Sequence, residues 1–289
     1  MQRNYNSDLA LENYKNETNH DYKSISYSEN DLDYCKILKQ VILNNHTNEK
    51  NSYVTISFDK ITLLDEFTLN MISEVIAKEA YKIVSRFIKE NKIQRTSFML
   101  AGLGNPELTA DAVGPLAVQY TNITRHLPIS DDPFPNVSAI APNVLSKTGI
   151  ETVEILKAIA DRINADIVIA IDSLAAKSCN RLGCTVQISD AGIMPGSGIG
   201  NERKAINYKT VGRPVISIGV PTVVDSATLV LDALEKGGIS NISDTLISVL
   251  KSGKSFFVTP KESDNITRIA SKLIAEGLNQ MFGINHKIF

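Results

Sequence analysis

The sequence predicts an α/β fold with a mostly parallel central sheet and helices on both faces. The run 167–171 is continuous and rich in β-branched residues, which is typical of a strand covered on both sides. A second apolar run, 98–101, ends in a tight polar loop, and residue 111 begins a segment with helical apolar spacing. In open parallel sheets, ligands and reactive side chains gather at the carboxyl ends of the strands.

The other elements follow from the same periodicities. Strands are expected at 53–58, 185–188 and 214–220, and helices at 65–92, 153–163 (with 148–151 leading into it), 224–234, 244–250 and 265–281. The Pro-rich segment 128–142 is expected to be a loop. Asp172 is expected to terminate its strand, so that it shares the carboxyl edge of the sheet with Asp111.

Length and composition favour a single packed domain. The chain has 289 residues, of which 43% are hydrophobic, and we find no internal repeat and no linker. We expect a propeptide at 1–8 and one α/β domain at 9–289, with a core at about 98–235 and a helical covering at about 240–289.

The N-terminal fifty residues are polar and carry only short apolar patches. We expect about the first thirty to be disordered or loosely attached. The small apolar island 8–12 within them is interpreted, on composition alone, as a frayed tail.

The net charge and the absence of targeting signals argue against a nucleic-acid-binding, secreted or membrane protein. A net charge of -2 provides no global basic field for nucleic acid. The N-terminus lacks the apolar core of a signal peptide, and no apolar run reaches the length of about 18 residues that a membrane span needs. Three cysteines match neither a disulfide framework nor a structural zinc site, which indicates a reducing compartment. We therefore expect a soluble intracellular protein.

The loop after residue 101 does not match a nucleotide site. A dinucleotide fingerprint needs a third glycine, and Glu107 stands at that position. No phosphate-binding Gly-Lys-Ser/Thr loop occurs in the chain.

Carboxylates remain as the candidate catalytic groups. Ser197 lacks the spacing of a nucleophile elbow, a His-Glu-x-x-His motif is absent, and the cysteines have no nearby histidine. Two carboxyl groups in one site can hold one proton between them, which provides a general base and a general acid. The competing interpretation is that Asp111 and Asp172 are a helix cap and a surface loop acid. His126, the one central histidine, is either structural or catalytic.

A series of ordered motifs resembles the germination (spore) protease family of spore-forming bacteria. The blocks cover roughly residues 98 to 232 and are Gly-Leu-Gly-Asn at 102–105, Thr-Ala-Asp-Ala-Val-Gly-Pro at 109–115, Thr-Arg-His-Leu at 124–127, Thr-Gly-Ile-Glu-Thr at 148–152, Ile-Ala-Ile-Asp-Ser-Leu-Ala at 169–175, Gln-Ile-Ser-Asp-Ala-Gly-Ile at 187–193, Pro-Gly-Ser-Gly-Ile-Gly-Asn at 195–201 and Gly-Val-Pro-Thr-Val-Val-Asp at 219–225.

This resemblance implies a fold related to the hydrogenase-maturation proteases and a catalytic pair made of Asp111 and Asp172. It implies a zymogen that is cut between Asp8 and Leu9 and acts as a homotetramer in the spore core. The implied substrates are small acid-soluble DNA-binding spore proteins, with no direct contact to nucleic acid or membrane and no cofactor or metal.

Further residues are candidates for roles around this pair. The glycine-rich loop 192–201 is either a substrate loop, through the candidates Gly196, Ser197, Gly198 and Asn201, or a plain connector. Asn105, His126 and Asp190 are candidate supporting residues.

Two other functions are compatible with the sequence. One is a maturation-type protease that recognises a metal held by its client, and the other is a non-catalytic binding module on the same fold.

Overall fold

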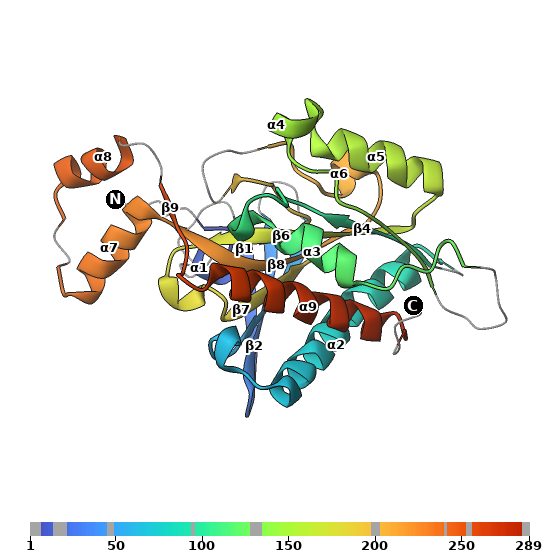
Figure 1. Cartoon of the computed structure of the whole chain (residues 1–289), viewed down its shortest axis with the longest axis horizontal. Helices are drawn as coiled ribbons and strands as arrows, with labels where there is room; N and C mark the ends of the chain where they lie inside the picture. The colour runs from blue at the N-terminus through green and yellow to red at the C-terminus, as the bar shows by residue number, and fades with distance from the viewer. Residues whose placement is uncertain are drawn as a thin grey trace.

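The computed structural model describes residues 7–13, 22–44, 49–93, 96–127, 135–197, 203–239, 242–252 and 256–284. One sheet runs through these residues in the order β1-β2-β3-β7-β8-β6-β4-β5, and β9 pairs with β8 (Figure 1). The strands are β1 Tyr22–Leu32, β2 Cys35–Asn44, β3 Lys50–Ser57, β4 Ser97–Gly102, β5 Asn136–Ile140, β6 Ile167–Ala176, β7 Thr185–Ser189, β8 Val215–Asp225 and β9 Phe257–Val258.

The sheet is mixed and mostly antiparallel, so the prediction of a mostly parallel sheet is wrong. Parallel pairing is confined to β5, β4, β6 and β8. The pairs β1–β2, β2–β3, β3–β7, β7–β8 and β8–β9 are antiparallel. The link 177–184 between β6 and β7 contains only the short turn η3 Cys179–Arg181. Without a crossover helix the chain reverses its direction at this link.

Helices cover both faces of the sheet, as predicted. One face packs against α2 Glu66–Glu90, α3 Val113–Tyr120 and α9 Ser263–Met281, and the other against α5 Thr152–Ile163 and α6 Tyr208–Val211. In Figure 1, α5 and α6 accordingly lie on the opposite side of the sheet from α2 and α9. The remaining helices and turns are α1 Ala10–Asn13, η1 Ile61–Leu63, η2 Thr109–Asp111, α4 Leu145–Thr148, α7 Ser226–Lys236 and α8 Asp244–Ser252.

Local capping explains where two predicted helices begin and end. Asp65 accepts a hydrogen bond from the Thr68 backbone N–H at 2.8 Å and so caps the start of α2. Asn164, at φ 53°, ends α5 in the left-handed conformation that asparagine tolerates.

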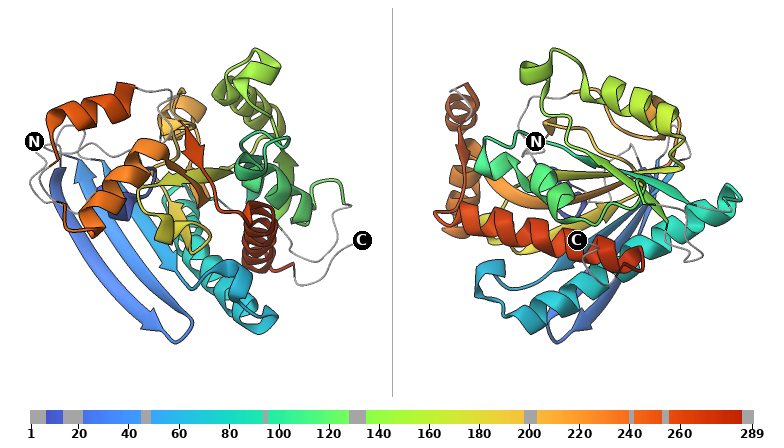
Figure 2. Two further views of the ribbon diagram at one scale, coloured as in Figure 1. Left: turned by 60° about the vertical axis from the view of Figure 1, so that its left-hand side comes forward. Right: turned by 45° about the vertical axis from the view of Figure 1, so that its right-hand side comes forward.

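The expectation that about the first thirty residues lack structure is wrong for residues 22–30, which belong to strand β1 of the hairpin β1–β2. The hairpin is completed by β3, and Figure 2 shows α2 running along these strands. Ile37 and Ile56 join the core beneath α2. Serine, asparagine and aspartate dominate the exposed strand β1, so its local composition resembles a loop, and the pairing that stabilises it is long-range.

Several boundaries also differ from the predictions, among them the strand expected at 214–220, which continues to Asp225. Asp172 does not terminate its strand, because β6 continues to Ala176 beside β8. Part of the Pro-rich segment, 136–140, is the parallel edge strand β5. Among the described residues, no helix combines the length and apolar character needed to cross a membrane.

Close packing between β4, β6 and α3 depends on Gly114. A Cβ atom added there would lie 2.3 Å from the Ile171 carbonyl oxygen and 2.4 Å from that of Leu103. These are backbone atoms in the middle of β6 and directly after β4, and they cannot move without moving the strands.

We predict that Gly114→Ala lowers the free energy of unfolding by about 1–3 kcal/mol, the usual cost of overpacking a core. Urea denaturation measures this change. Gly237→Ala is the matched control, because the nearest atom to its added Cβ is 3.3 Å away. Equal stability of the two variants would contradict the packing argument.

Candidate active site

A tight turn after β4 places Asp111 at the carboxyl edge of the sheet. The backbone N–H of Asn105 donates to Asp111 Oδ2 at 2.7 Å. Gly104 has φ 109°, and a Cβ atom at this position would lie 2.0 Å from the Asp111 carbonyl oxygen. Glycine is therefore required for the turn to close around the carboxylate.

Two threonine hydroxyl groups, one from β8 and one from α9, hold the same turn through its backbone carbonyls. Thr222 Oγ1 of β8 donates to the Ala110 carbonyl at 2.6 Å, and Thr267 Oγ1 of α9 donates to the Thr109 carbonyl at 3.0 Å. The C-terminal helix thus takes part in positioning Asp111.

Asp172 projects from β6 into a buried environment. Its exposed fraction is 6%, and its Oδ1 accepts a hydrogen bond from the Ser173 backbone N–H at 2.9 Å. It lies opposite Gly219 of β8, which in turn lies opposite Gln187 of β7. Residues directly opposite one another share a face of the sheet, so the three form one row across three strands.

Burial raises the pKa of both aspartates, and like charges raise that of Asp172 further. Desolvation raises the pKa of Asp172 well above its ordinary value of 3.8, and the charges of Asp111 and Asp8 raise it further. Desolvation also raises the pKa of Asp111, against the opposing hydrogen bond from Asn105. Such a pair favours a shared proton, the state that general acid–base catalysis requires.

Residues 7–12, which we call the docked segment, lie against the end of β6 beside these carboxylates. The Asp8 backbone N–H donates to the Ala175 carbonyl at 2.9 Å. The Asp8 carboxylate accepts from the Ala175 backbone N–H at 2.8 Å and from Ser197 Oγ at 2.6 Å. The predicted processing bond, Asp8–Leu9, is therefore held at the site.

Gln187 contacts the main chain on both sides of Leu9. Its Nε2 lies 3.2 Å from the Asp8 carbonyl oxygen, and its Oε1 accepts from the Ala10 backbone N–H at 2.7 Å. No motif in the sequence identifies Gln187 as a site residue. The available signal was a large polar residue between Val186 and Ile188 in a buried strand, where an amide needs specific partners.

Apolar and acidic side chains complete the docking. Leu9 and Leu11 are buried in a cluster with Leu174, Ala176, Leu182 and Val224. Glu12 accepts hydrogen bonds from the backbone N–H groups of Lys177 at 2.7 Å and Ser178 at 3.3 Å. The expectation of a frayed tail is wrong for this segment, because these contacts come from residues more than 160 positions away.

The glycine-rich loop contributes Ser197 to the site, next to Gly196. Together with the floor of β7 and β8, the loop encloses a cavity of about 290 Å³ beside Asp8, lined in part by Gln187, Ser189 and Ser217. Gly198 and Asn201 lie outside the described residues.

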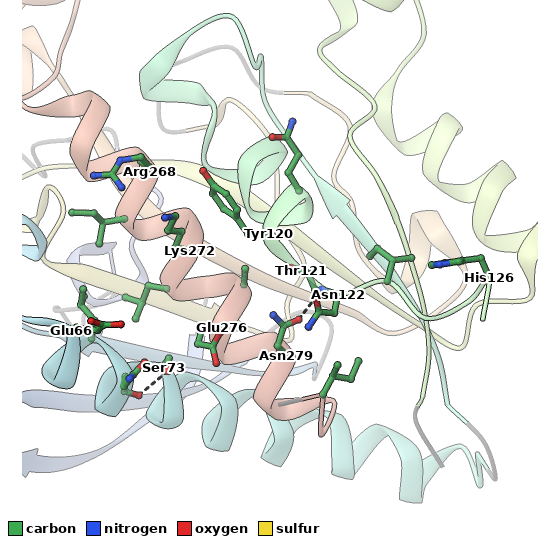
Figure 3. A pocket seen from close by; sticks show the side chains of 18 residues that line it. Glu66, Ser73, Tyr120, Thr121, Asn122, His126, Arg268, Lys272, Glu276 and Asn279 are labelled. Carbon is green, nitrogen blue, oxygen red and sulfur yellow. Dashed lines mark hydrogen bonds between the residues drawn. The ribbon is translucent and has the colours of Figure 1, made fainter. Parts of the chain in front are cut away.

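His126 lies in a different part of the molecule. It is exposed and lines a larger cavity of about 830 Å³ between α2, α3 and α9. Figure 3 shows this cavity with Tyr120, Lys272 and Glu276 on its walls. None of the residues that line it belongs to the aspartate pair or the docked segment.

Asp190 lies toward the amino ends of the parallel strands, because it follows β7, which runs antiparallel to β8. Its carboxylate forms an ion pair with Arg86 of α2 and accepts a hydrogen bond from the Ser52 backbone N–H at 2.6 Å. These contacts brace β3 and β7 against α2. Asn105, by contrast, supports Asp111 directly through its backbone.

Among the residues that the structure describes, no group of three or more histidine, cysteine, aspartate or glutamate side chains is arranged to hold a metal ion.

Residues 5–236 match the profile of a family described as Germination protease. The chain belongs to the germination protease family. It is 35% identical to the germination protease of Clostridium perfringens, with 96% of this chain and 94% of that protein covered. It is 42% identical to the germination protease of Priestia megaterium, with 79% of this chain and 64% of that protein covered.

Membership of the germination protease family makes the chain an endopeptidase, a hydrolase that acts on peptide bonds. The family indicated by the sequence motifs is thereby confirmed. Its motifs at 102–105, 109–115 and 169–175 are the segments that position Asp111 and Asp172.

The raised pKa of Asp172 has a consequence for stability. A carboxyl group whose folded pKa lies above its unfolded value contributes stability below the unfolded pKa, and that contribution is lost as the pH rises through the folded pKa. At neutral pH the buried Asp172 therefore lowers the free energy of unfolding. An uncharged side chain of the same shape removes this destabilisation.

We predict that Asp172→Asn raises the Tm of the uncleaved protein at neutral pH by at least about 2 °C, and that the gain shrinks as the pH falls toward about 4. Circular dichroism melts measure it, on protein shown to be uncut by intact mass. Asp31→Asn, at an exposed surface ion pair, is the control with little expected change. A gain that grew on acidification would contradict the assignment.

Proposed function

We propose that this chain is an aspartate-dependent endopeptidase made as a zymogen, in which Asp111 and Asp172 activate water. Its first reaction is cleavage of its own Asp8–Leu9 bond, which removes residues 1–8. Its second is the first cut in small acid-soluble spore proteins during germination. The observation that carries this proposal is the docked segment, whose Asp8 is close enough to raise the pKa of Asp172.

The reaction needs one water molecule and one proton held by the pair. The ionised carboxyl group takes a proton from water as the water oxygen bonds to the Asp8 carbonyl carbon, and the carbonyl electron pair moves onto its oxygen. When the tetrahedral intermediate collapses, the C–N bond breaks and the Leu9 nitrogen takes a proton from the pair. The products are a carboxyl terminus at Asp8 and an amino terminus at Leu9.

We assign neither aspartate a fixed role as acid or base. Asp172 is the more deeply buried, and Asp111 accepts the backbone hydrogen bond that favours its charged form. Two interacting groups nevertheless titrate as one unit, so the pair as a whole holds the proton.

The substrate is expected to bind as a released, extended chain. The docked segment pairs its backbone with Ala175 at the end of β6 and inserts alternate apolar side chains into one cluster. An unfolded spore protein freed from DNA could present the same features.

The proposal places this reaction in the cytoplasm of the spore core and includes a fold related to hydrogenase-maturation proteases.

We predict that wild-type protein, incubated at mildly acid pH, loses its first eight residues and acquires Leu9 as its new terminus. Asp111→Asn and Asp172→Asn are expected to slow this cleavage by at least about 10³-fold, because each removes a group that must carry the proton. Intact mass and N-terminal sequencing measure the product.

The matched control is Asp190→Asn, because the side chain of Asp190 is 3% exposed and contacts Arg86 and Ser52, which lie outside the pair. It is expected to cut at close to the wild-type rate once the folded fraction is accounted for. If either Asp111→Asn or Asp172→Asn cut as fast as wild type, that residue would leave the catalytic pair.

We also predict a homotetramer, the assembly that the family resemblance implies. Light scattering coupled to gel filtration should give a mass four times that of the 31.6 kDa chain. A single species at the mass of one chain would contradict this prediction.

A further inference from the structure

We propose that Gln187 is a third catalytic residue, whose side-chain amide binds the carbonyl oxygen of the bond to be cut and stabilises the oxyanion that forms there. The inference rests on the proposed function, because it takes Asp8–Leu9 as that bond. It adds to the aspartate pair a hydrogen-bond donor to the carbonyl oxygen on which the negative charge develops.

The first observation is the contact itself. Gln187 Nε2 lies 3.2 Å from the Asp8 carbonyl oxygen, the atom that becomes an oxyanion when water adds to the carbonyl carbon. Donors in such sites work best at about 2.7–3.1 Å from the oxyanion. The contact is thus slightly long in the ground state and can shorten as charge develops, which is the behaviour that accelerates a reaction.

The second observation fixes which end of the amide faces the carbonyl. Gln187 Oε1 accepts a hydrogen bond from the Ala10 backbone N–H at 2.7 Å. Rotating the amide by half a turn would set its NH₂ group against this N–H and its oxygen against the Asp8 carbonyl. The peptide backbone therefore selects the orientation in which Gln187 donates to the carbonyl.

The third observation is the placement of Gln187 relative to the aspartates. Asp172, Gly219 and Gln187 form one row on adjacent strands. With strands about 4.8 Å apart, the carboxyl and amide groups stand on either side of the middle strand. Gly219 contributes no side chain between them, and Leu174 lies in the space where its Cβ would be.

Burial strengthens the interaction. Gln187 is 7% exposed and Asp172 is 6% exposed. A hydrogen bond to developing charge is worth more in such a low-dielectric site than in water. As water adds, the carbonyl electron pair moves onto the carbonyl oxygen. Gln187 donates a hydrogen bond to that oxygen and keeps its own proton. The electron pair re-forms the C=O double bond as the C–N bond breaks.

The test uses the full-length chain and its own Asp8–Leu9 bond. Gln187→Met keeps the length of the side chain and removes its donor and acceptor atoms. We expect the first-order rate constant of self-cleavage to fall by about 10²–10³-fold, as for other single oxyanion donors. Because the bond is part of the same molecule, the rate constant does not depend on recruiting a substrate.

Loss of docking must be separated from loss of catalysis. Hydrogen exchange at Asp8 and Glu12, whose backbone N–H groups donate to the carbonyls of Ala175 and Leu9, reports docking, and we would measure it for Gln187→Met in an Asp172→Asn background, where the bond stays intact. We expect these amides to remain protected, because the Leu9 and Leu11 cluster and the Glu12 contacts do not involve Gln187. Slow cleavage together with lost protection would overturn the catalytic assignment.

The chain offers a matched control in Gln40→Met. Gln40 is also buried, at 1% exposure, on β2 of the same sheet, and its Oε1 meets no donor among the described residues. We expect this variant to cut at close to the wild-type rate.

The remaining outcomes separate this inference from the proposed function. If wild type cuts at Asp8–Leu9 and Gln187→Met cuts within about threefold of it, or if Gln40→Met is slowed equally, the oxyanion role of Gln187 fails alone. If wild type does not cut this bond at all, the proposed function fails with it.

Discussion

The arrangement of the rest of the site depends on the burial of the Asp172 carboxyl group. A lone carboxylate in an apolar sheet would be protonated and inert, so its chemistry depends on a second, better solvated carboxyl group within electrostatic reach. The turn that brings Asp111 there requires glycine at 104, while glycine at 114 lets α3 approach β4 and β6. Hydroxyl groups from β8 and α9 then hold the turn.

In the zymogen, the docked segment lies next to the buried carboxyl group of Asp172. Its leucines bury themselves on the apolar end of β6, and its backbone is held by Gln187 and Ala175. Docking also brings a third carboxylate, Asp8, near the pair and raises the pKa of Asp172. Binding of the segment and protonation of the pair are therefore linked, and acid favours the docked form.

The sequence predicted the parts of this arrangement that are local. Asp111 and Asp172 could be found because each comes after an apolar run in the sequence, and α2 and α5 because their periodicity and caps are strong. The hairpin β1–β2 was missed because its exposed strand has a loop-like composition. The place of Gln187 depends on the pairing of β7 with β8, and the contact between Asp8 and Ser197 on the approach of two segments far apart in the chain, neither of which a local pattern specifies.

The central claim, that two carboxyl groups share one proton, is tested most directly by the pH dependence of the self-cleavage rate constant. The account predicts a bell-shaped profile between about pH 3 and pH 9, because cleavage needs one group ionised and the other protonated. The rate should fall in acid when both are protonated and in base when both are ionised. A rate constant that did not change with pH across this range would contradict the shared proton.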